Sequence, residues 1–176
     1  MTEESPALAA LLVTCYDRCR FESSMPRLQI AAAAEADHEW CARLMAANEP
    51  WITLRRDLEG CRAALLRPGT ELFLARDQSS AQPLGFILLA AYGFAASPYV
   101  ASIAVAPEAQ GQSVGSQLMV FAEQHFAERG HLFLLVSSFS PRAQQFYRRH
   151  GYDFIGELKD YIVPGHSELI FHKRLP

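Results

Sequence analysis

The sequence predicts one α/β domain in which helices cover both faces of a single mixed sheet. Its 176 residues are enough for one domain with a sizeable core, and half of them are hydrophobic while only a fifth are charged. Short strand-like segments separated by turn residues fill the middle of the chain. Beyond Tyr99 the pattern becomes strand, helix, strand, which is typical of a parallel pair of strands.

Composition argues against several functional classes. The formal net charge of -3 gives no basic surface for nucleic acid or for an anionic membrane. No apolar run reaches the roughly 20 residues of a membrane span, and the first residues lack the basic start of a secretory signal, so we expect a cytoplasmic protein. Cys15 and Cys19 are spaced to share a helix face, but no nearby His or Cys pair completes a zinc site. Reduced thiols are therefore favoured over zinc, and no metal is expected.

The first part of the chain predicts an appendage followed by a strand and a helix. Residues 1–26 are interpreted as an N-terminal arm or extra helix, with Ala7–Cys19 as its helical part, and the domain is predicted to cover residues 27–176. Leu28–Ala33 is typical of a short strand. A helix is expected from about Asp37, and the turn residues Asn48–Pro50 end it.

A second helix and a β-hairpin are predicted next. Thr53 is a suitable N-cap for a helix whose apolar residues recur at helical spacing, and Pro68-Gly69 stops it. The apolar residues of this helix are Leu54, Leu58, Cys61 and Leu65. Glu71–Arg76 and Leu84–Tyr92 flank a polar turn and are therefore expected to pair as a hairpin.

The last third alternates strands with helices and ends in a strand pair. Tyr99–Val105 is a strand, a helix is expected from about Gly115 to Glu128, and the continuous apolar run Leu132–Val136 is typical of a buried parallel strand. Ser140-Pro141 is a helix start, and Gly151 ends that helix. The final predicted strands are Tyr152–Val163 and Glu168–Lys173.

The segment Ser102–Ser116 carries the first chemical signal. A strand ends at Ala106-Pro107, a loop with small residues follows, and a helix begins near Val114. The loop amides and the first N–H groups of the helix lack intrahelical partners and lie at the positive end of the helix dipole, so they suit a pyrophosphate. A plain strand-to-helix turn is the alternative interpretation.

The run Ala143-Gln-Gln-Phe-Tyr-Arg-Arg-His-Gly-Tyr152 is the second signal, because it follows the phosphate-type loop after an intervening strand. With both signals in this order, the sequence resembles the GNAT superfamily of acyl-CoA N-acyltransferases over about Leu28–Lys173. The resemblance implies a single, mostly antiparallel sheet of about six to seven strands with a central parallel pair. The family's loop is Q/R-x-x-G-x-G/A, whereas this chain has Gln110-Gly-Gln-Ser-Val-Gly115, with Ser113 in place of the first motif glycine.

The resemblance implies acetyl-CoA as co-substrate, with its pyrophosphate on the loop and its pantetheine between two strands. The residues expected to bind it are Ile103, Ala104, Val105, Gln110, Gly111, Gln112, Ser113, Val114, Gly115, Ser116, Ser140, Ala143, Phe146 and Tyr147.

The same resemblance implies an N-acetyltransferase in which the amine attacks directly within a ternary complex. Tyr147 is expected to be the general acid to the CoA thiolate, and the Val105 N–H is expected to stabilise the developing oxyanion. A core aromatic is the alternative interpretation for Tyr147. The general base is left open among Glu49, Glu71, Asp160, His166, Glu168 and a water chain at Ser137.

Acceptor contacts are expected from the loop between the first two helices and from the final strand pair. The residues singled out are Glu49, Trp51, Tyr92, Asp160 and His166, with Asn48 and Tyr161 beside them. The partner is expected to be a small-molecule or peptide amine, with no nucleic acid and no membrane, and a homodimer through the final strands is expected. A non-catalytic acyl-CoA-binding regulatory module is the second interpretation, and a structural domain without cofactor is the third.

Overall fold

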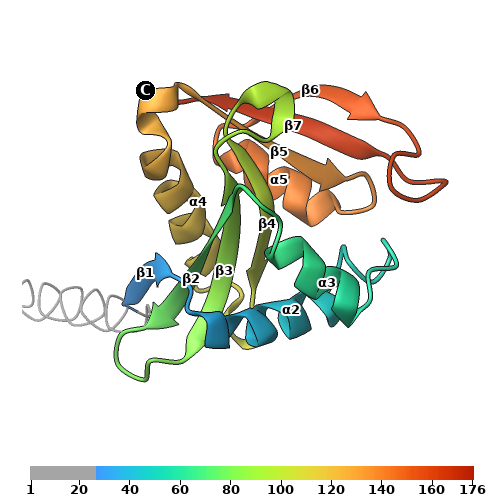
Figure 1. The fold of residues 1–176 in the computed structure, drawn as a ribbon. Coiled ribbons are helices and arrows are strands. Elements are labelled where there is room, and N and C mark those ends of the chain that lie inside the picture. Colours follow the sequence, from blue (N-terminus) through green and yellow to red (C-terminus); the bar gives the residue numbers. More distant parts are fainter. Residues whose placement is uncertain (1–26) are drawn as a thin grey trace, which may run out of the picture.

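A computed structural model describes residues 27–176, so the predicted Ala7–Cys19 helix and the thiols of Cys15 and Cys19 lie outside the described residues. A seven-stranded sheet in the order β1-β2-β3-β4-β5-β7-β6 runs through the domain (Figure 1). Its strands are β1 (Leu28–Ala32), β2 (Thr70–Asp77), β3 (Pro83–Ala90), β4 (Tyr99–Val105), β5 (His131–Ser137), β6 (Asp153–Leu158) and β7 (Glu168–Arg174). The helices of the described part are α2 (His38–Ala46), α3 (Leu58–Leu65), α4 (Val114–His125) and α5 (Pro141–Arg149), with short 3-10 turns between some elements.

The sheet confirms the predicted topology. All neighbouring strands pair antiparallel except β4 and β5, which are parallel. The two strands pair only at Tyr99 with Phe133 and at Val100 with Leu134. On its other side β4 carries a bulge at Ala101, because Leu88 pairs with Ser102 while Leu89 already pairs with Val100. An extra residue of this kind bends a strand, and β4 separates from β5 beyond this point.

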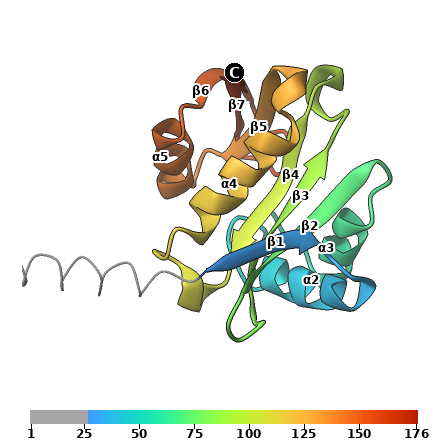
Figure 2. The same ribbon diagram turned by 90° about the vertical axis from the view of Figure 1, so that its left-hand side faces the viewer.

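Helices cover both faces of the sheet, as predicted. Helix α4 lies against β3 and β4 on one face, while α2 and α3 lie on the opposite face (Figures 1 and 2). Each helix buries one apolar side between itself and the strands. The largest fully buried side chains come from both layers and from the sheet: Tyr152, Phe86, Phe171, Met45, Ile87, Leu88, Leu89, Leu118 and Met119.

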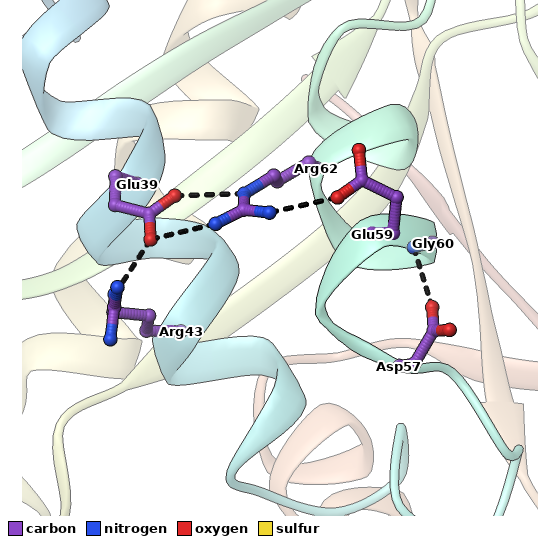
Figure 3. Close-up of polar contacts among 6 residues, drawn as sticks. All are labelled: Glu39, Arg43, Asp57, Glu59, Gly60 and Arg62. Atoms are coloured by element: carbon purple, nitrogen blue, oxygen red, sulfur yellow. Dashed lines mark hydrogen bonds and ion pairs between the residues drawn. The ribbon is translucent and has the colours of Figure 1, made fainter.

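The start of the second helix was predicted wrongly. Thr53 does not cap it, because the segment after Trp51 forms turns and Arg55 has a positive φ of 55° that interrupts a helix. Helix α3 begins at Leu58 instead, and the Asp57 carboxylate accepts a hydrogen bond from the Gly60 N–H at 2.8 Å (Figure 3). The Thr53 hydroxyl donates to Glu49 Oε1 at 3.0 Å.

One arginine joins α2 to α3. The Arg62 guanidinium donates to both oxygens of Glu39 on α2, at 2.9 and 3.0 Å, and to Glu59 on its own helix at 2.8 Å (Figure 3). The hydrogen bonds from Arg62 and Arg43 hold the pKa of Glu39 low, at about 2. These polar contacts therefore join α2 to α3 at their exposed sides.

The other differences between the predicted and the observed elements concern where two strands end. Strand β3 ends at Ala90 and not at Tyr92, and β6 ends at Leu158 because Asp160 adopts a positive φ of 50° and starts a turn. Strand β6 forms an edge of the sheet with Phe154 and Ile155 exposed, and pairing of two copies there stays a prediction. Within residues 27–176, none of the helices combines the length and the apolar character that crossing a membrane requires.

The new helix start is testable. Replacing Asp57 by alanine removes the only side-chain cap of α3, so the free energy of unfolding should fall by about 1 kcal/mol in urea titrations. Asp57→Asn keeps an acceptor oxygen and should lose much less. Equal losses in the two variants would show that the cap does not stabilise α3.

Candidate active site

A cavity of about 680 Å³ opens where β4 and β5 separate. One wall consists of β4 and β5, another of the segment between α2 and α3, and the remainder of the start of α5 and the β6–β7 connection. Three residues predicted to bind the cofactor line it, namely Ile103, Ser140 and Ala143, together with Tyr147. The structure therefore brings residues from several strands, helices and connections to one opening in the sheet.

The free edge of β4 faces this opening. The Ala106 N–H donates to Leu84 O of β3 at 2.8 Å. Since consecutive peptide groups of a strand point to opposite edges, the Val105 N–H points to the edge that β5 has left. The Gln110 side-chain amide lies 3.5 Å from Val105 O, which points to the same edge. The Val105 N–H is therefore directed away from β3, although Val105 itself does not line the cavity, and its role as an oxyanion donor stays a prediction.

The loop from Gln110 to Ser113 is exposed and ends in an unusual backbone conformation. Gly111 and Ser113 have positive φ values of 78° and 63°, and Ser113 is the N-cap residue of α4. A left-handed residue followed by a helical one turns successive N–H groups to the same side and forms an anion-binding hollow. Among residues 27–176, no loop hydrogen bond uses the N–H groups of Gly111, Ser113 or Val114. The loop thus fits a pyrophosphate. The positive φ of Ser113 explains why the family motif has a glycine at this position.

Helix α5 packs closely against the beginning of α4. A Cβ placed on Gly115 would lie 3.5 Å from the Phe146 ring, which is ordinary contact, so this position accepts Gly or Ala. His150 Nε2 lies 3.1 Å from Ser116 Oγ. Burial lowers the pKa of His150, which favours the neutral ring at neutral pH. Phe146 therefore supports the loop from behind and is not itself a cavity wall.

Tyr147 reaches the cavity from α5. The residue is only 8% exposed, and burial, followed by the neighbouring Tyr99, raises the pKa of its phenol far above the usual value. Its side chain lines the cavity, and its hydroxyl makes no hydrogen bond to another residue of the described part. The phenol is thus protonated and accessible from the cavity, as a general acid requires.

Glu168 is the buried carboxyl of the site. It begins β7, is 4% exposed, and accepts a hydrogen bond from Ser137 Oγ of β5 at 2.8 Å. Burial raises the pKa of Glu168 above its ordinary value of 4.5, although the Ser137 hydrogen bond opposes this shift. Both residues line the cavity with Tyr147. Sequence reasoning included Glu168 and Ser137 among several bases without choosing, because their pairing across two strands is not visible in the chain order.

The other candidate bases are occupied or lie elsewhere. Glu49 lines the cavity, but its two oxygens accept from the Thr53 N–H and hydroxyl at 3.2 and 3.0 Å. Glu71 lies 3.3 Å from His125 Nε2, outside the cavity. Asp160 accepts from the Gly165 N–H at 2.6 Å, and His166 packs edge-on against Phe139.

The predicted acceptor residues therefore divide into two groups. Glu49 and the buried Trp51 line the cavity. Tyr92, Asp160 and His166 do not line it. Tyr92 is 74% exposed with the Arg129 guanidinium 4.7 Å from its ring centre, because β3 ends before it and directs it to the far end of the sheet.

Three polar cavity residues were missed from sequence. Tyr99 starts β4, while Arg56 and Arg67 lie on either side of α3. No motif marks them, since their role depends on which way the α2–α3 pair faces the sheet. Burial, followed by Glu168, raises the pKa of Tyr99 to about 12.

Comparisons with known proteins agree with this fold. The family model described as an acetyltransferase (GNAT) domain matches residues 68–153. The crystal structure of nourseothricin acetyltransferase is 30% identical with a TM-score of 0.56, and the match covers 62% of this chain and 67% of that one. This chain therefore belongs to the GNAT family of acetyltransferases.

Two further solved structures show the same fold at lower identity. A GNAT-family protein from Desulfovibrio desulfuricans has a TM-score of 0.69 at 16% identity, covering 85% of this chain and 99% of that one. Spermidine N-acetyltransferase from Vibrio cholerae, in complex with CoA and spermine, has a TM-score of 0.66 at 16% identity, covering 84% and 95%. A search of curated proteins found no match.

The loop conformation predicts a stabilising substitution. Ser113→Gly relieves a left-handed conformation that costs a non-glycine residue about 1–2 kcal/mol, and the added chain entropy offsets only part of that. Thermal unfolding should therefore show a higher melting temperature. Gly111→Ala, at a φ of 78°, should lower it. A lower melting temperature for Ser113→Gly would contradict the strain at this position.

Proposed function

We propose that the protein is an N-acetyltransferase that moves an acetyl group from acetyl-CoA to a primary amine by direct attack in a ternary complex. One observation carries the proposal: a protonated, accessible Tyr147 and a buried Glu168 line one cavity, and that cavity opens at the free edge of β4. Support for an amine acceptor comes from the Vibrio cholerae relative, a spermidine N-acetyltransferase.

We expect the cofactor to bind along a track that runs from the loop before α4 to the cavity beside β4. The N–H groups of Gly111, Ser113 and Val114 would hold the two phosphates, and the free edge of β4 at Ile103–Val105 would hold the pantetheine amides. When bound, acetyl-CoA supplies the activated acetyl thioester. The side chains of Ser140 and Ala143, at the start of α5, form the opposite wall of this track.

Val105 and Tyr147 act on the two sides of the bond that breaks. The Val105 N–H donates toward the carbonyl oxygen, where negative charge develops, and one such donor is typically worth about 3–4 kcal/mol. Tyr147 holds a proton on its phenol oxygen and donates it to the leaving sulfur. The leaving group is a thiolate whose conjugate acid has a pKa near 8.5, so it is a weaker base than the phenolate, and the proton transfer depends on the negative charge that develops on sulfur as the C–S bond breaks.

Glu168 is our proposed general base. An amine is mostly protonated at neutral pH, so the site must remove a proton before the nitrogen can attack. A carboxylate in an apolar surrounding accepts a proton more readily than one in water, and burial raises the pKa of Glu168 in this direction. The Ser137 hydroxyl holds one oxygen and leaves the other for the amine or an intervening water.

A non-catalytic acyl-CoA-binding module is the second candidate function, favoured by Ser113 in the phosphate loop in place of the family glycine. Such a module needs a cofactor track but neither an accessible phenol nor a buried carboxyl beside it. The presence of both in the cavity therefore favours the enzyme.

Tyr147→Phe tests the proposed acid. The variant keeps the ring and its packing but loses the proton, so kcat for thiol release from acetyl-CoA should fall about 10²–10⁴-fold. Acetyl-CoA should still raise the melting temperature of wild type and variant alike, because the loop is unchanged. An unaltered kcat would refute the acid, and no thermal shift in wild type would refute the function.

Glu168→Gln tests the proposed base through pH. In wild type, kcat/KM should rise with pH through a pKa above 4.5, as the carboxyl ionises, and this rise should disappear in the variant. Because the folded-state pKa is raised, ionising Glu168 costs folding free energy at neutral pH, so the variant should also melt at a higher temperature. Full activity with an unchanged pH profile would exclude Glu168 as the base.

A further inference from the structure

The charged residues of the cavity wall differ in whether another residue already pairs with them. They are Glu49, Arg56, Arg67 and Glu168. Glu49 is already engaged, because both of its carboxylate oxygens accept hydrogen bonds from Thr53. Glu168 is therefore the acidic group of the wall that a ligand cation can approach, and only one of its oxygens is taken by Ser137.

The two arginines of the cavity wall differ from Glu49 in their contacts. Within residues 27–176, the guanidinium groups of Arg56 and Arg67 make no ion pair and no side-chain hydrogen bond, although other arginines of the domain do, for example Arg62 with Glu39. Arg56 lies just before α3 and Arg67 just after it, and both line the cavity. Unpaired guanidinium groups lining a cavity are ready to bind an anion.

Tyr99 places these groups near one another. Its side chain lines the same cavity, and its phenol is affected by Glu168, Tyr161, Arg67 and Arg56 at once. The buried carboxyl and the two arginines therefore line one cavity together with Tyr99. A ligand in this region meets one negative group and two positive ones.

From this arrangement we infer that the acetyl acceptor is a small amino acid-like molecule, whose amine lies at Glu168 and whose carboxylate lies at Arg56 and Arg67. The inference rests on the proposed function and names its substrate class. A planar carboxylate suits the guanidinium fork, and the amine and carboxylate together match the signs of the wall. A polycationic amine would satisfy Glu168 with one nitrogen and bring its remaining charges toward the arginines, which is unfavourable.

Matched acceptor pairs test this inference. Thiol release from acetyl-CoA is measured with glycine, alanine, phenylalanine, glutamate and lysine, each against its carboxamide, and with lysine against 1,5-diaminopentane and spermidine. Rates are expressed per neutral amine, because the amine pKa differs within a pair. The carboxylate member should have the higher kcat/KM in the preferred pair, by about tenfold or more.

Arginine variants then locate the anion site. Arg56→Gln and Arg67→Gln should each reduce the ratio of amino acid to carboxamide, whereas Arg55→Gln, an exposed neighbour outside the cavity wall, should keep it. Binding gives an independent readout. With CoA present, the preferred amino acid should raise the wild-type melting temperature more than its carboxamide does, and the two cavity variants should lose that difference.

The outcomes separate this inference from the proposed function. Turnover that is equal or faster with the carboxamides or polyamines overturns the acceptor class and leaves the acetyltransferase standing. A carboxylate preference that persists in both cavity variants overturns the roles of Arg56 and Arg67. Acetyl-CoA binding with no acceptor acetylated overturns the inference in favour of the binding module, and the absence of both binding and turnover overturns the proposed function as well.

Discussion

The separation of β4 from β5 is the constraint on which the rest of the site depends. Two strands that pair at only two positions leave one edge of each without hydrogen bonds, and the bulge at Ala101 bends β4 in the region where this begins. Unpaired edges inside a sheet are costly unless a ligand or water satisfies them. The opening is therefore useful because it supplies backbone donors, such as the Val105 N–H, that are already in place.

Burial of ionisable groups gives the site its chemistry. Tyr99, Tyr147 and Glu168 lose water at the bottom of the cavity, and each pKa moves in the direction that favours the neutral form. The phenols therefore stay protonated, and the carboxyl gains affinity for a proton.

The two halves of the cavity depend on different parts of the chain. One half is built from β4 and the start of α5, both within the segment that matches the family model. The other half is built from the segment between α2 and α3 and from the β6–β7 connection, mostly outside that match. Proteins that share a fold differ in function because the side chains of their sites differ. The acceptor specificity of this protein must therefore be argued from its own side chains.

The sequence by itself determined the fold class, the order of the elements along the chain and the parallel pair, because each depends on local periodicity, turn chemistry or a motif of near neighbours. The same motifs predict the phosphate loop and the role of Tyr147, which stay proposals. The same kind of reasoning predicted the start of one helix wrongly. Thr53 was a plausible N-cap, but the positive φ of Arg55 prevents a helix there, and Asp57 caps α3 instead. Only the tertiary structure decided that Glu168 meets Ser137, that Arg56 and Arg67 share a wall with Tyr99, and that Tyr92 faces away. Those relations join residues far apart in the chain, and they are fixed by how helices pack on the sheet and not by any spacing along it.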